Sequence, residues 1–468
     1  MKLLRALRLD QAASSHSVIS LVGAGGKTTA LFQLARQYKA IFDTRNSKNE
    51  TRRSNTEYPR SIILTATSHL GVWQIPLADH HIIANDESDL ANLPSAGVIL
   101  VTGGVEGDRT APVSKSALNW LRAEAKERGT PLLIEADGSR QKALKAPAAH
   151  EPAIPSFTDL VIHVSGLGAL GAPLDDEHIH RAAHFSQLSG LPLSAAVTPQ
   201  AVTAVLAHPE GGLKDIPPGA RRIALLNQAD TPELRSIGGG MVNALLAHFH
   251  AVVLGSLPEP DNFQTFEPVA GIILAAGSAT RFGSAKQLLD WKGKPFVRHV
   301  AETALHAGLQ PVVVVTGFHH ADVESALSGL PVLIVHNPDY AQGQSTSMKA
   351  ALSSPSLHPK DLGRVGAAIF LLADQPQIPV EVIRALTEAH TRSLAPILAP
   401  LVLEERRANP VLFDRDVFPD LMQVTGDVGG RAVFSKHKVE YLPWHDDLLL
   451  FDVDKPEDYQ KLLNIGKD

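Results

Sequence analysis

A glycine-rich turn near the start of the chain has the composition of a phosphate-binding loop. The segment SVISLVGAGGKTT ends an apolar run with Gly23 and Gly26 and continues into Lys27 and Thr28. Glycines let backbone N–H groups curl around phosphates, a lysine neutralises phosphate charge, and a hydroxyl at a helix start can hold Mg²⁺. The spacing is the compact G-x-x-G-K-T form, because position 21 is leucine rather than glycine. These four residues therefore predict a nucleotide site.

Two carboxylates follow a later strand-like run, PLLIEAD at residues 131–137. Glu135 and Asp137 stand two residues apart, so in a strand they project to the same side. Ligands of open α/β sheets bind beyond the carboxyl ends of the strands. We therefore expect Glu135 and Asp137 to hold Mg²⁺, together with Thr28, or to orient a water molecule. A solvated strand end is the alternative interpretation.

A second glycine turn carries cations at fixed offsets. Residues 269–283 read VAGIILAAGSATRFG, and KQLL follows at residues 286–289. Nucleotidyl transfer needs a backbone cradle for a triphosphate and cations that stabilise charge on the α-phosphate and the departing pyrophosphate. The turn at Gly277 would supply the cradle. Arg281 and Lys286 would supply the catalytic cations.

Carboxylates that could complete this second site follow two further apolar runs. FLLADQP places Asp374 after one run, and LLLFDVDKP places Asp452 and Asp454 after another. Carboxylates together with substrate phosphates form the usual environment of Mg²⁺. A single aspartate after a strand is commonly a helix cap, but two such strand ends in one domain favour a metal site.

Each glycine turn requires a strand before it and a helix after it, so each opens an α/β domain of its own. Near-continuous apolar strands that alternate with helices indicate mostly parallel sheets covered on both faces. We expect a P-loop-type nucleotide-binding domain at residues 1–257, a linker at 258–268, and a Rossmann-like nucleotidyltransferase domain at 269–468. Further strands are predicted at residues 61–66, 97–102, 131–136, 159–164, 221–227, 311–316, 331–336, 366–373, 396–403 and 448–454.

Helices and loops follow from local signals. Helices are predicted at residues 114–128, where Gly129 follows, and at 295–307, where a proline begins the first turn. The polar, aperiodic residues 44–60 predict a surface insertion.

Composition limits the class of protein. The 468 residues contain no cysteine, which excludes disulfides, thiolate metal sites and a cysteine nucleophile. The formal charge of −6 argues against a general nucleic-acid binder. No apolar run approaches the ~18 residues of a membrane span, and the first residues lack a signal-peptide core, so we expect a cytoplasmic protein.

The first part of the chain resembles the selenium-dependent hydroxylase accessory protein family (YqeC-like) over residues 17–255. The resemblance rests on VGAGGKTT, TATSHL, EADGSRQKALKAPAAHEP, HIHR and the turn NQAD. The resemblance implies a P-loop fold and leaves the reaction open, with ATP or GTP as the possible nucleotide. The NQAD turn at residues 227–230 also resembles the N-K-x-D base-reading turn of GTPases, with glutamine in place of lysine.

The second part resembles the molybdenum cofactor cytidylyltransferases (MocA-like), relatives of the guanylyltransferase MobA. The motifs are LAAGSATRFGSAKQLL, NPDYAQGQSTSMK, LADQP, NPVLF, TGDVGGR and DVDKPED, within residues 270–463. Alanine at position 276 and the K-Q pair at 286–287 favour the cytidine branch. Alanine at position 408, where relatives usually carry glycine, departs from the pattern.

This resemblance implies that the terminal phosphate of Mo-molybdopterin attacks the α-phosphate of CTP, giving molybdopterin cytosine dinucleotide and pyrophosphate. The implied Mg²⁺ ligands are Asp374 and Asp454. The implied contacts to base and ribose come from Leu274, Ala275, Ala276 and Gly277. The implied substrate-binding residues are Gln344, Ser345, Ser347, Asn409 and Gly429.

Other functions remain open from the sequence. The second domain could be a different cytidylyltransferase or a guanylyltransferase, acting on methylerythritol phosphate or a sugar phosphate. The whole chain could instead be a nucleotide-gated cofactor chaperone. For the cytidylyltransferase that the resemblance implies, the expected partners are Mo-molybdopterin, CTP and, transiently, a molybdenum hydroxylase that receives the cofactor.

Overall fold

A computed structural model describes residues 1–10, 18–52, 59–259, 261–277, 282, 285–357, 365–403 and 406–465, without the side chains of 48–52 and 356. The chain divides into two compact units, Met1–Phe266 and Glu267–Asp468. The boundary lies inside the stretch 258–268 that the sequence suggests as a linker. Residues Gln264–Phe266 of that stretch form a strand that pairs within the N-terminal unit.

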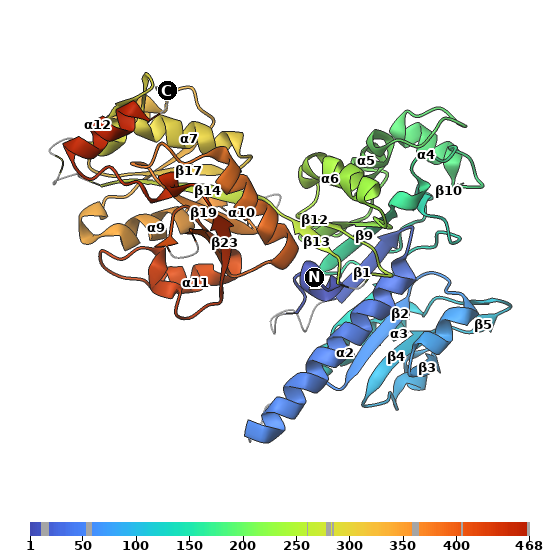
Figure 1. The fold of residues 1–468 in the computed structure, drawn as a ribbon. Coiled ribbons are helices and arrows are strands. Elements are labelled where there is room, and N and C mark those ends of the chain that lie inside the picture. Colours follow the sequence, from blue (N-terminus) through green and yellow to red (C-terminus); the bar gives the residue numbers. More distant parts are fainter. Residues whose placement is uncertain are drawn as a thin grey trace. The chain divides into compact units, whose positions relative to one another are not determined.

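The described part of the N-terminal unit contains a nine-stranded sheet, parallel except for its edge strand β13 (Figure 1). In spatial order the strands are β13 (Gln264–Phe266), β12 (Ala251–Leu254), β11 (Arg221–Asn227), β9 (Leu160–Gly166), β1 (Val18–Gly23), β7 (Leu132–Glu135), β2 (Ser61–Ala66), β4 (Gly97–Thr102) and β3 (His80–Ile83). Two short pairs join β5 (Val105–Glu106) to β6 (Arg109–Thr110) and β8 (Leu144–Lys145) to β10 (Ile179–His180). The helices are α1 (Leu3–Ala6), α2 (Lys27–Arg52), α3 (Lys115–Arg128), α4 (Ala182–Ser189), α5 (Pro199–Ala207) and α6 (Pro232–Leu246).

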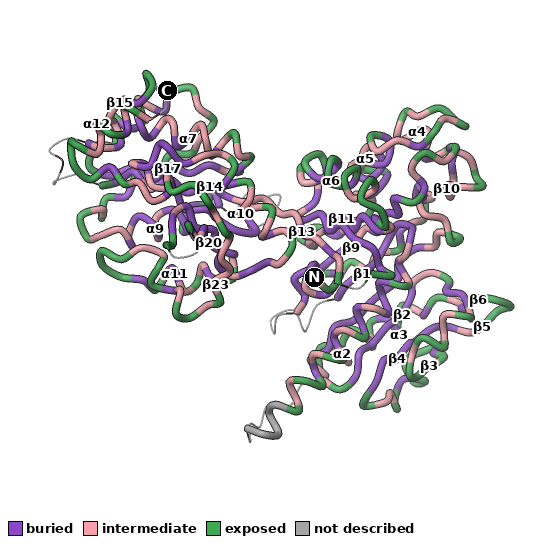
Figure 2. Tube along the Cα trace, viewed as in Figure 1, coloured by how far each residue is buried: buried purple, intermediate pink, exposed green. Residues whose placement is uncertain are grey.

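Both faces of this sheet are covered, which explains its continuously apolar strands. Along β11, Ile223 and Leu225 belong to a core shared with α1 and α2. The alternate residues Ala224 and Leu226 pack with α5 and α6. Figure 2 shows the central strands as buried along their lengths.

The C-terminal unit is built on a mostly parallel sheet in which β22 runs antiparallel to both of its neighbours. The order is β18 (Leu333–His336), β17 (Val312–Thr316), β14 (Val269–Ala275), β19 (Ala367–Leu372), β22 (Val411–Asp414), β20 (Ile397–Val402) and β21 (Arg406–Arg407), and β23 (Val439–Trp444) also pairs with β20. A hairpin joins β15 (Asp290–Trp291) to β16 (Lys294–Pro295). The helices are α7 (Phe296–His306), α8 (His320–Ala326), α9 (Gln344–Leu352), α10 (Val380–Ser393), α11 (Phe418–Leu421) and α12 (Pro456–Asn464). Helices α7 and α10 pack on one face of the sheet and α9 and α11 on the other.

Two of the local expectations are wrong. Residues 448–454 form no strand: a 3-10 turn covers Asp447–Leu450 and an irregular segment follows. Residues 44–52 of the polar segment 44–60 are helical, because α2 continues to Arg52. Side-chain to backbone hydrogen bonds, such as Thr44 Oγ1 to Ala40 O at 2.8 Å, continue along this exposed part of the helix. Residues 53–58 lie outside the described part of the chain.

A buried contact between a histidine and an aspartate links two elements of the C-terminal unit. His390 Nε2, on α10, lies 2.7 Å from Asp414 Oδ2 at the end of β22, and both side chains are less than 5% exposed. Removing one partner of a buried pair leaves the other polar group without its contact, which costs about 3 kcal/mol.

We therefore expect Asp414→Ala to accelerate amide hydrogen exchange in β22 and α10 by roughly 100-fold. Hydrogen exchange followed by mass spectrometry on the full chain measures this effect. The control is Asp420→Ala, which removes a more exposed acid that pairs with Lys436 and His437 and should leave the same peptides unchanged. Equal exchange in the parent protein and Asp414→Ala would show that the pair does not stabilise this region.

Candidate functional site

The first glycine turn wraps the end of β1 and opens α2. Gly23 and Gly25 have φ angles of +95° and +83°. A Cβ atom at Gly23 would lie 2.2 Å from Val164 O, and one at Gly25 would lie 2.5 Å from Gly166 N. The neighbouring strand β9 thus approaches the turn so closely that side chains are excluded, and the turn can present its backbone amides at the start of a helix.

Lys27 and Thr28 occupy the first turn of α2, as predicted, and each contacts a carboxylate at the edge of the sheet. Lys27 Nζ donates to Gly23 O at 2.6 Å and lies 3.3 Å from Asp137 Oδ1. Thr28 Oγ1 donates to Glu135 Oε2 at 2.7 Å. Burial raises the pKa of Glu135, while the charge of Lys27 acts in the opposite direction. The structure therefore brings Lys27 and Thr28 together with the two carboxylates that the sequence predicts as site residues.

The two carboxylates have different surroundings. Glu135 lines a cavity beside Thr28, whereas Asp137 is 2% exposed and surrounded by donors. Asp137 Oδ2 accepts from Gly23 N at 3.0 Å and from Lys145 Nζ at 2.9 Å. Asp137 thus contacts the glycine turn and two lysines, and these contacts hold the turn and the lysines in position. Glu135 is the carboxylate that remains near open space.

Three charged residues that the sequence motifs do not single out as site residues continue this network. Lys145 Nζ lies 2.7 Å from Glu151 Oε2, and Arg181 makes two contacts with Glu151 at 2.8 and 3.2 Å. Burial would raise the pKa of Glu151, but hydrogen bonds from Arg181 and Lys145 lower it to about 2. Lys145, Glu151 and Arg181 lie in the segments KAP, HEP and HIHR, which carry the family resemblance. Only the fold shows that these segments meet.

A cavity of about 790 Å³ opens in front of this network. Its lining includes the residues of the glycine turn, Glu135, and basic side chains from later segments, namely Arg109, Arg140, Lys142 and Arg181. His180 also lines it, and burial together with the neighbouring cations lowers the pKa of His180 to about 4. A helix start, backbone amides and several cations around one cavity are the features of an anion site.

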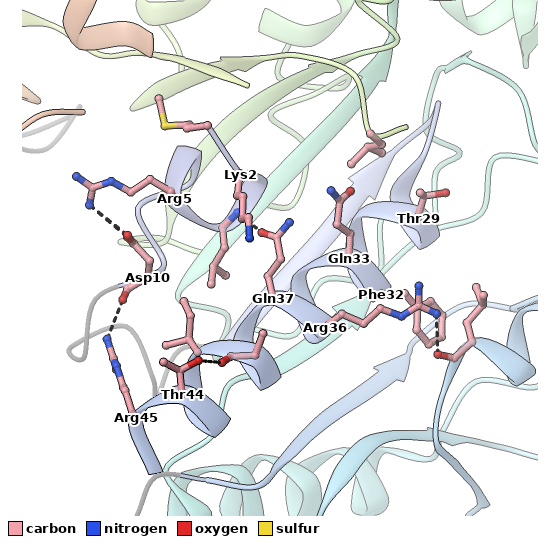
Figure 3. A pocket seen from close by; sticks show the side chains of 16 residues that line it. Lys2, Arg5, Asp10, Thr29, Phe32, Gln33, Arg36, Gln37, Thr44 and Arg45 are labelled. Atoms are coloured by element: carbon pink, nitrogen blue, oxygen red, sulfur yellow. Dashed lines mark hydrogen bonds and ion pairs between the residues drawn. The ribbon is translucent and has the colours of Figure 1, made fainter. Parts of the chain in front are cut away.

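A second cavity, of about 930 Å³, lies between α1 and the outer face of α2 (Figure 3). Apolar and amide side chains line much of it. Arg5 and Asp10 form an ion pair of 3.2 Å, and Arg45 donates to Asp10 O at 3.0 Å. The charged groups at this end of the cavity contact one another.

The second glycine turn lies at the end of β14, beside the end of β19. Leu274, Ala275 and Ala276 lead into Gly277, where a Cβ atom would lie more than 4 Å from the described residues other than its chain neighbours. Gln287 Nε2 donates to Gly277 O at 3.2 Å and so connects the turn to the segment that carries Lys286. Arg281 lies outside the described residues.

Lys286 and two of the predicted carboxylates lie near this turn. Lys286 Nζ is 2.8 Å from Asp454 Oδ1. Asp374 follows Ala373, whose N–H donates to Leu274 O at 3.2 Å. Burial raises the pKa of Asp374, with Lys286 lowering it and Asp452 and Asp454 raising it. The three acids thus influence one another, although within the described ranges no group of three His, Asp or Glu side chains is already arranged as a metal site.

Two predicted substrate loops lie side by side. Ser345 N donates to Gly426 O at 3.3 Å, and a Cβ atom at Gly429 would lie 2.7 Å from Gln344 Oε1. Ser345 and Ser347 are buried, and Ser347 accepts from Asn337 at 3.0 Å. Asn409 lies on a separate segment, where a cis peptide bond joins it to Pro410 before β22. The fold thus joins the loops of Gln344 and Gly429.

The charge network in the N-terminal unit makes stability depend on acid. Because the folded pKa of Glu151 is about 2 and an unpaired glutamate titrates near 4.5, its stabilising effect is complete above pH 4.5 and is lost as pH falls toward 2. We expect Glu151→Gln to reduce the free energy of unfolding by about 2 kcal/mol at pH 7. The difference between the variant and the parent protein should shrink by more than half at about pH 3. Urea unfolding across this pH range measures it.

The matched control is Glu127→Gln, which removes an exposed carboxylate from α3. It should change the unfolding free energy little at either pH. A deficit of Glu151→Gln that stays constant from pH 7 to pH 3 would contradict the ionic origin of the effect.

Comparisons with known proteins agree with the two-unit organisation. Residues 271–441 match the family described as MobA-like NTP transferase domain, and residues 19–183 match the YqeC protein family. The protein YqeC of Escherichia coli (strain K12) is 31% identical over 275 residues, covering 54% of this chain and 93% of that protein. Nicotine blue oxidoreductase of Paenarthrobacter nicotinovorans is 31% identical over 206 residues, covering 42% of this chain and 96% of that protein.

Among solved structures, Rv0371c from Mycobacterium tuberculosis H37Rv is 25% identical with a TM-score of 0.37, covering 42% of this chain and 97% of that one. No helix in the described part of this chain is long and apolar enough to cross a membrane. The protein is therefore an α/β polypeptide that belongs to the YqeC family in its N-terminal unit and to the MobA-like NTP transferase family in its C-terminal unit.

Proposed function

We propose that the C-terminal unit is a molybdenum cofactor cytidylyltransferase. It would transfer CMP from CTP to Mo-molybdopterin and release pyrophosphate. The observation that supports this best is the Lys286–Asp454 ion pair, which lies near Asp374 at the glycine turn that ends β14. A lysine, clustered carboxylates and a backbone turn in one place are the groups that phosphoryl-type transfer needs.

The reaction makes one bond and breaks one bond at the α-phosphorus of CTP. The terminal phosphate oxygen of molybdopterin attacks this phosphorus, and the bond to the β-phosphate oxygen breaks, so pyrophosphate leaves with the electron pair. Lys286 and Arg281 would stabilise the negative charge that develops on the α-phosphate and on the leaving group. The residues from Leu274 to Gly277 would hold the nucleotide, because they form the turn at the end of β14 that Gln287 connects to the segment of Lys286.

The carboxylate oxygens of Asp374 and Asp454 have the chemistry that Mg²⁺ prefers, so these residues would hold it together with the triphosphate. When bound, Mg²⁺ would neutralise phosphate charge. The present contact between Lys286 and Asp454 would then loosen, since both groups would face the same phosphates. Gln344, Ser345, Ser347, Asn409 and Gly429 are proposed to surround the second substrate.

The choice of CTP and of molybdopterin rests on sequence features. Ala276 and the Lys286–Gln287 pair follow the cytidine branch of the family that the motifs resemble. Gln287 fastens the turn through Gly277 O, so this residue contributes to the shape of the nucleotide site. The name of one relative indicates an oxidoreductase instead. A direct assay of pyrophosphate release separates these functions.

We expect the full chain to release pyrophosphate from CTP only when Mo-molybdopterin and Mg²⁺ are present, and more slowly from GTP or ATP. Lys286→Ala should lower the rate by about 10²- to 10³-fold, because it removes a cation from the developing charge. The control is Lys294→Ala, which removes an exposed lysine of the same unit that pairs with Glu302. Activity with GTP or ATP but not CTP would overturn the assignment of the nucleotide.

For the N-terminal unit we propose nucleotide binding in support of molybdenum hydroxylase maturation. Gly23, Gly26 and Lys27 would contact the phosphates, and Thr28 with Glu135 would hold Mg²⁺. Asp137 would act mainly through the loop, given its contacts with Gly23 and Lys145. Because Lys145 also neutralises Asp137, the Lys27 ammonium can turn toward a phosphate without leaving a buried carboxylate unpaired.

We expect Lys27→Ala to weaken binding of ATP or GTP by roughly 30-fold or more, since it removes a charged contact to phosphate. Equilibrium titration with fluorescent analogues of both nucleotides measures the change. Lys39→Ala, on the exposed side of α2, is the control and should bind like the parent protein. Unchanged binding by Lys27→Ala would refute the proposed phosphate site.

A further inference from the structure

A tight turn after β7 holds two side chains in an unusual backbone conformation beside the first glycine turn. Lys142 N donates to Ser139 O at 3.0 Å, and the two residues between them, Arg140 and Gln141, have φ angles of +49° and +61°. Turns with two positive φ angles usually carry asparagine, aspartate or glycine, because a Cβ atom makes this conformation unfavourable for most residues. Arginine and glutamine are therefore not explained by the turn itself, and their side chains indicate a function.

Positive φ angles gather at the cavity in front of the glycine turn. Of the ten non-glycine residues with positive φ in the described part of the chain, four line this cavity: Arg140, Gln141, Arg181 and Gln228. Such conformations persist only where surrounding contacts hold them, and they cluster at ligand-binding sites. One such contact is present here, because Gly25 N donates to Lys142 O at 3.0 Å and so fixes the strained turn against the glycine turn.

The strained turn brings positive charge that no acid among the described residues neutralises. Lys142 Nζ donates to the backbone carbonyl of Glu177, and no described carboxylate lies within ion-pair distance of Arg140 or Lys142. Arg181 differs, since Glu151 pairs with it at 2.8 Å. Two such cations match the charge of about −1.5 to −2 on a phosphate monoester, whereas a carboxylate would leave one of them uncompensated.

Arg140 and Arg181 lie near each other at His180. Burial and, after it, the charges of neighbouring cations that include Arg181 and Arg140 lower the pKa of His180 to about 4. All three side chains line the cavity. At neutral pH the imidazole is uncharged, so it can donate one hydrogen bond to an anion beside the two arginines.

We propose that the turn at residues 139–142, together with Arg181, forms a second anion site in this cavity, which binds the phosphate group of a phosphate monoester. The glycine turn holds a nucleotide at the same time, and this part of the inference rests on the proposed nucleotide binding. Guanidinium and ammonium groups bind phosphate oxygens through charge-assisted hydrogen bonds. The volume of about 790 Å³ lies in the range of small-molecule sites. The N-terminal unit thus binds a phosphorylated small molecule in addition to the nucleotide.

The test titrates phenyl phosphate into the full chain at constant ionic strength, with Mg²⁺ and a saturating non-hydrolysable analogue of ATP or GTP. The parent protein should bind phenyl phosphate at least about tenfold more tightly than benzoate, which carries a single charge. Arg140→Gly should weaken phenyl phosphate binding by about 10- to 30-fold and leave the affinity for the nucleotide analogue unchanged. Isothermal titration calorimetry measures both affinities.

Thermal unfolding of Arg140→Gly separates contact with a ligand from a structural role. Glycine accepts a positive φ without steric cost, so the variant should unfold at no lower a temperature than the parent protein. The matched control is Lys292→Gly, which removes an exposed cation at a φ of +51° from the hairpin of β15 and β16. It should leave the binding of phenyl phosphate unchanged.

Three results would overturn the second anion site. They are equal affinity of the parent protein for phenyl phosphate and benzoate, unchanged phenyl phosphate binding by Arg140→Gly, and weaker binding of the nucleotide analogue by Arg140→Gly. The last result would assign the arginine to the phosphates of the nucleotide.

Failure of the proposed nucleotide site gives a different result. If the parent protein binds neither analogue, the nucleotide site is refuted, and Lys27→Ala then tests the second anion site alone. Phenyl phosphate binding that persists in Lys27→Ala and is lost in Arg140→Gly would support the second site. Binding that is lost in both variants would place the phosphate at the glycine turn and refute the second site.

Discussion

The buried carboxylate of Asp137 is the contact on which the N-terminal site depends. It accepts from the amide of Gly23 and lies within ion-pair distance of both Lys27 and Lys145. A buried carboxylate is unfavourable unless it is paired and hydrogen-bonded, so the loop, the first turn of α2 and the segment that carries Lys145 must stay together. The arrangement of these three segments therefore depends on the pairing of one buried negative charge.

The same carboxylate gives the loop a way to respond to a ligand. Two lysines share Asp137, so one of them can turn to a phosphate while the other keeps the carboxylate neutralised. The second lysine, Lys145, is in turn linked through Glu151 to Arg181, at the wall of the cavity. A chain of direct contacts therefore joins the glycine turn to Arg181, which also lines the cavity.

Both units have a glycine turn at the end of a parallel strand, but different side chains contact it. In each, the first parallel strand of the unit ends in a glycine turn beside the end of a neighbouring strand, where backbone amides and side chains from distant segments meet. The N-terminal unit follows this turn with a long helix whose start faces the cavity. The C-terminal unit instead fastens its turn through Gln287 and places the Lys286–Asp454 pair beside it.

The sequence by itself determined most of the elements and the nature of both sites. Apolar runs, glycine stops and caps are local signals, so strands such as β2 and helices such as α3 were predicted within a residue or two. The glycine turns with Lys27 and Lys286 can also be recognised in the sequence, because the residues that define each turn lie close together along the chain. Local signals mislead where tertiary contacts decide. The polar residues 44–52 belong to helix α2, and residues 448–454 form no strand although they begin with four apolar side chains.

Only the tertiary structure decided which distant residues act together. Lys145, Glu151 and Arg181 lie on segments whose spacing along the chain carries no sign of contact, and they meet because parallel strands bring their connections to one edge of the sheet. The different surroundings of Glu135 and Asp137, two residues apart on one strand end, likewise depend on what packs against each. Spacing in a sequence can place two carboxylates on the same side, but burial and the neighbouring donors determine what each of them can do.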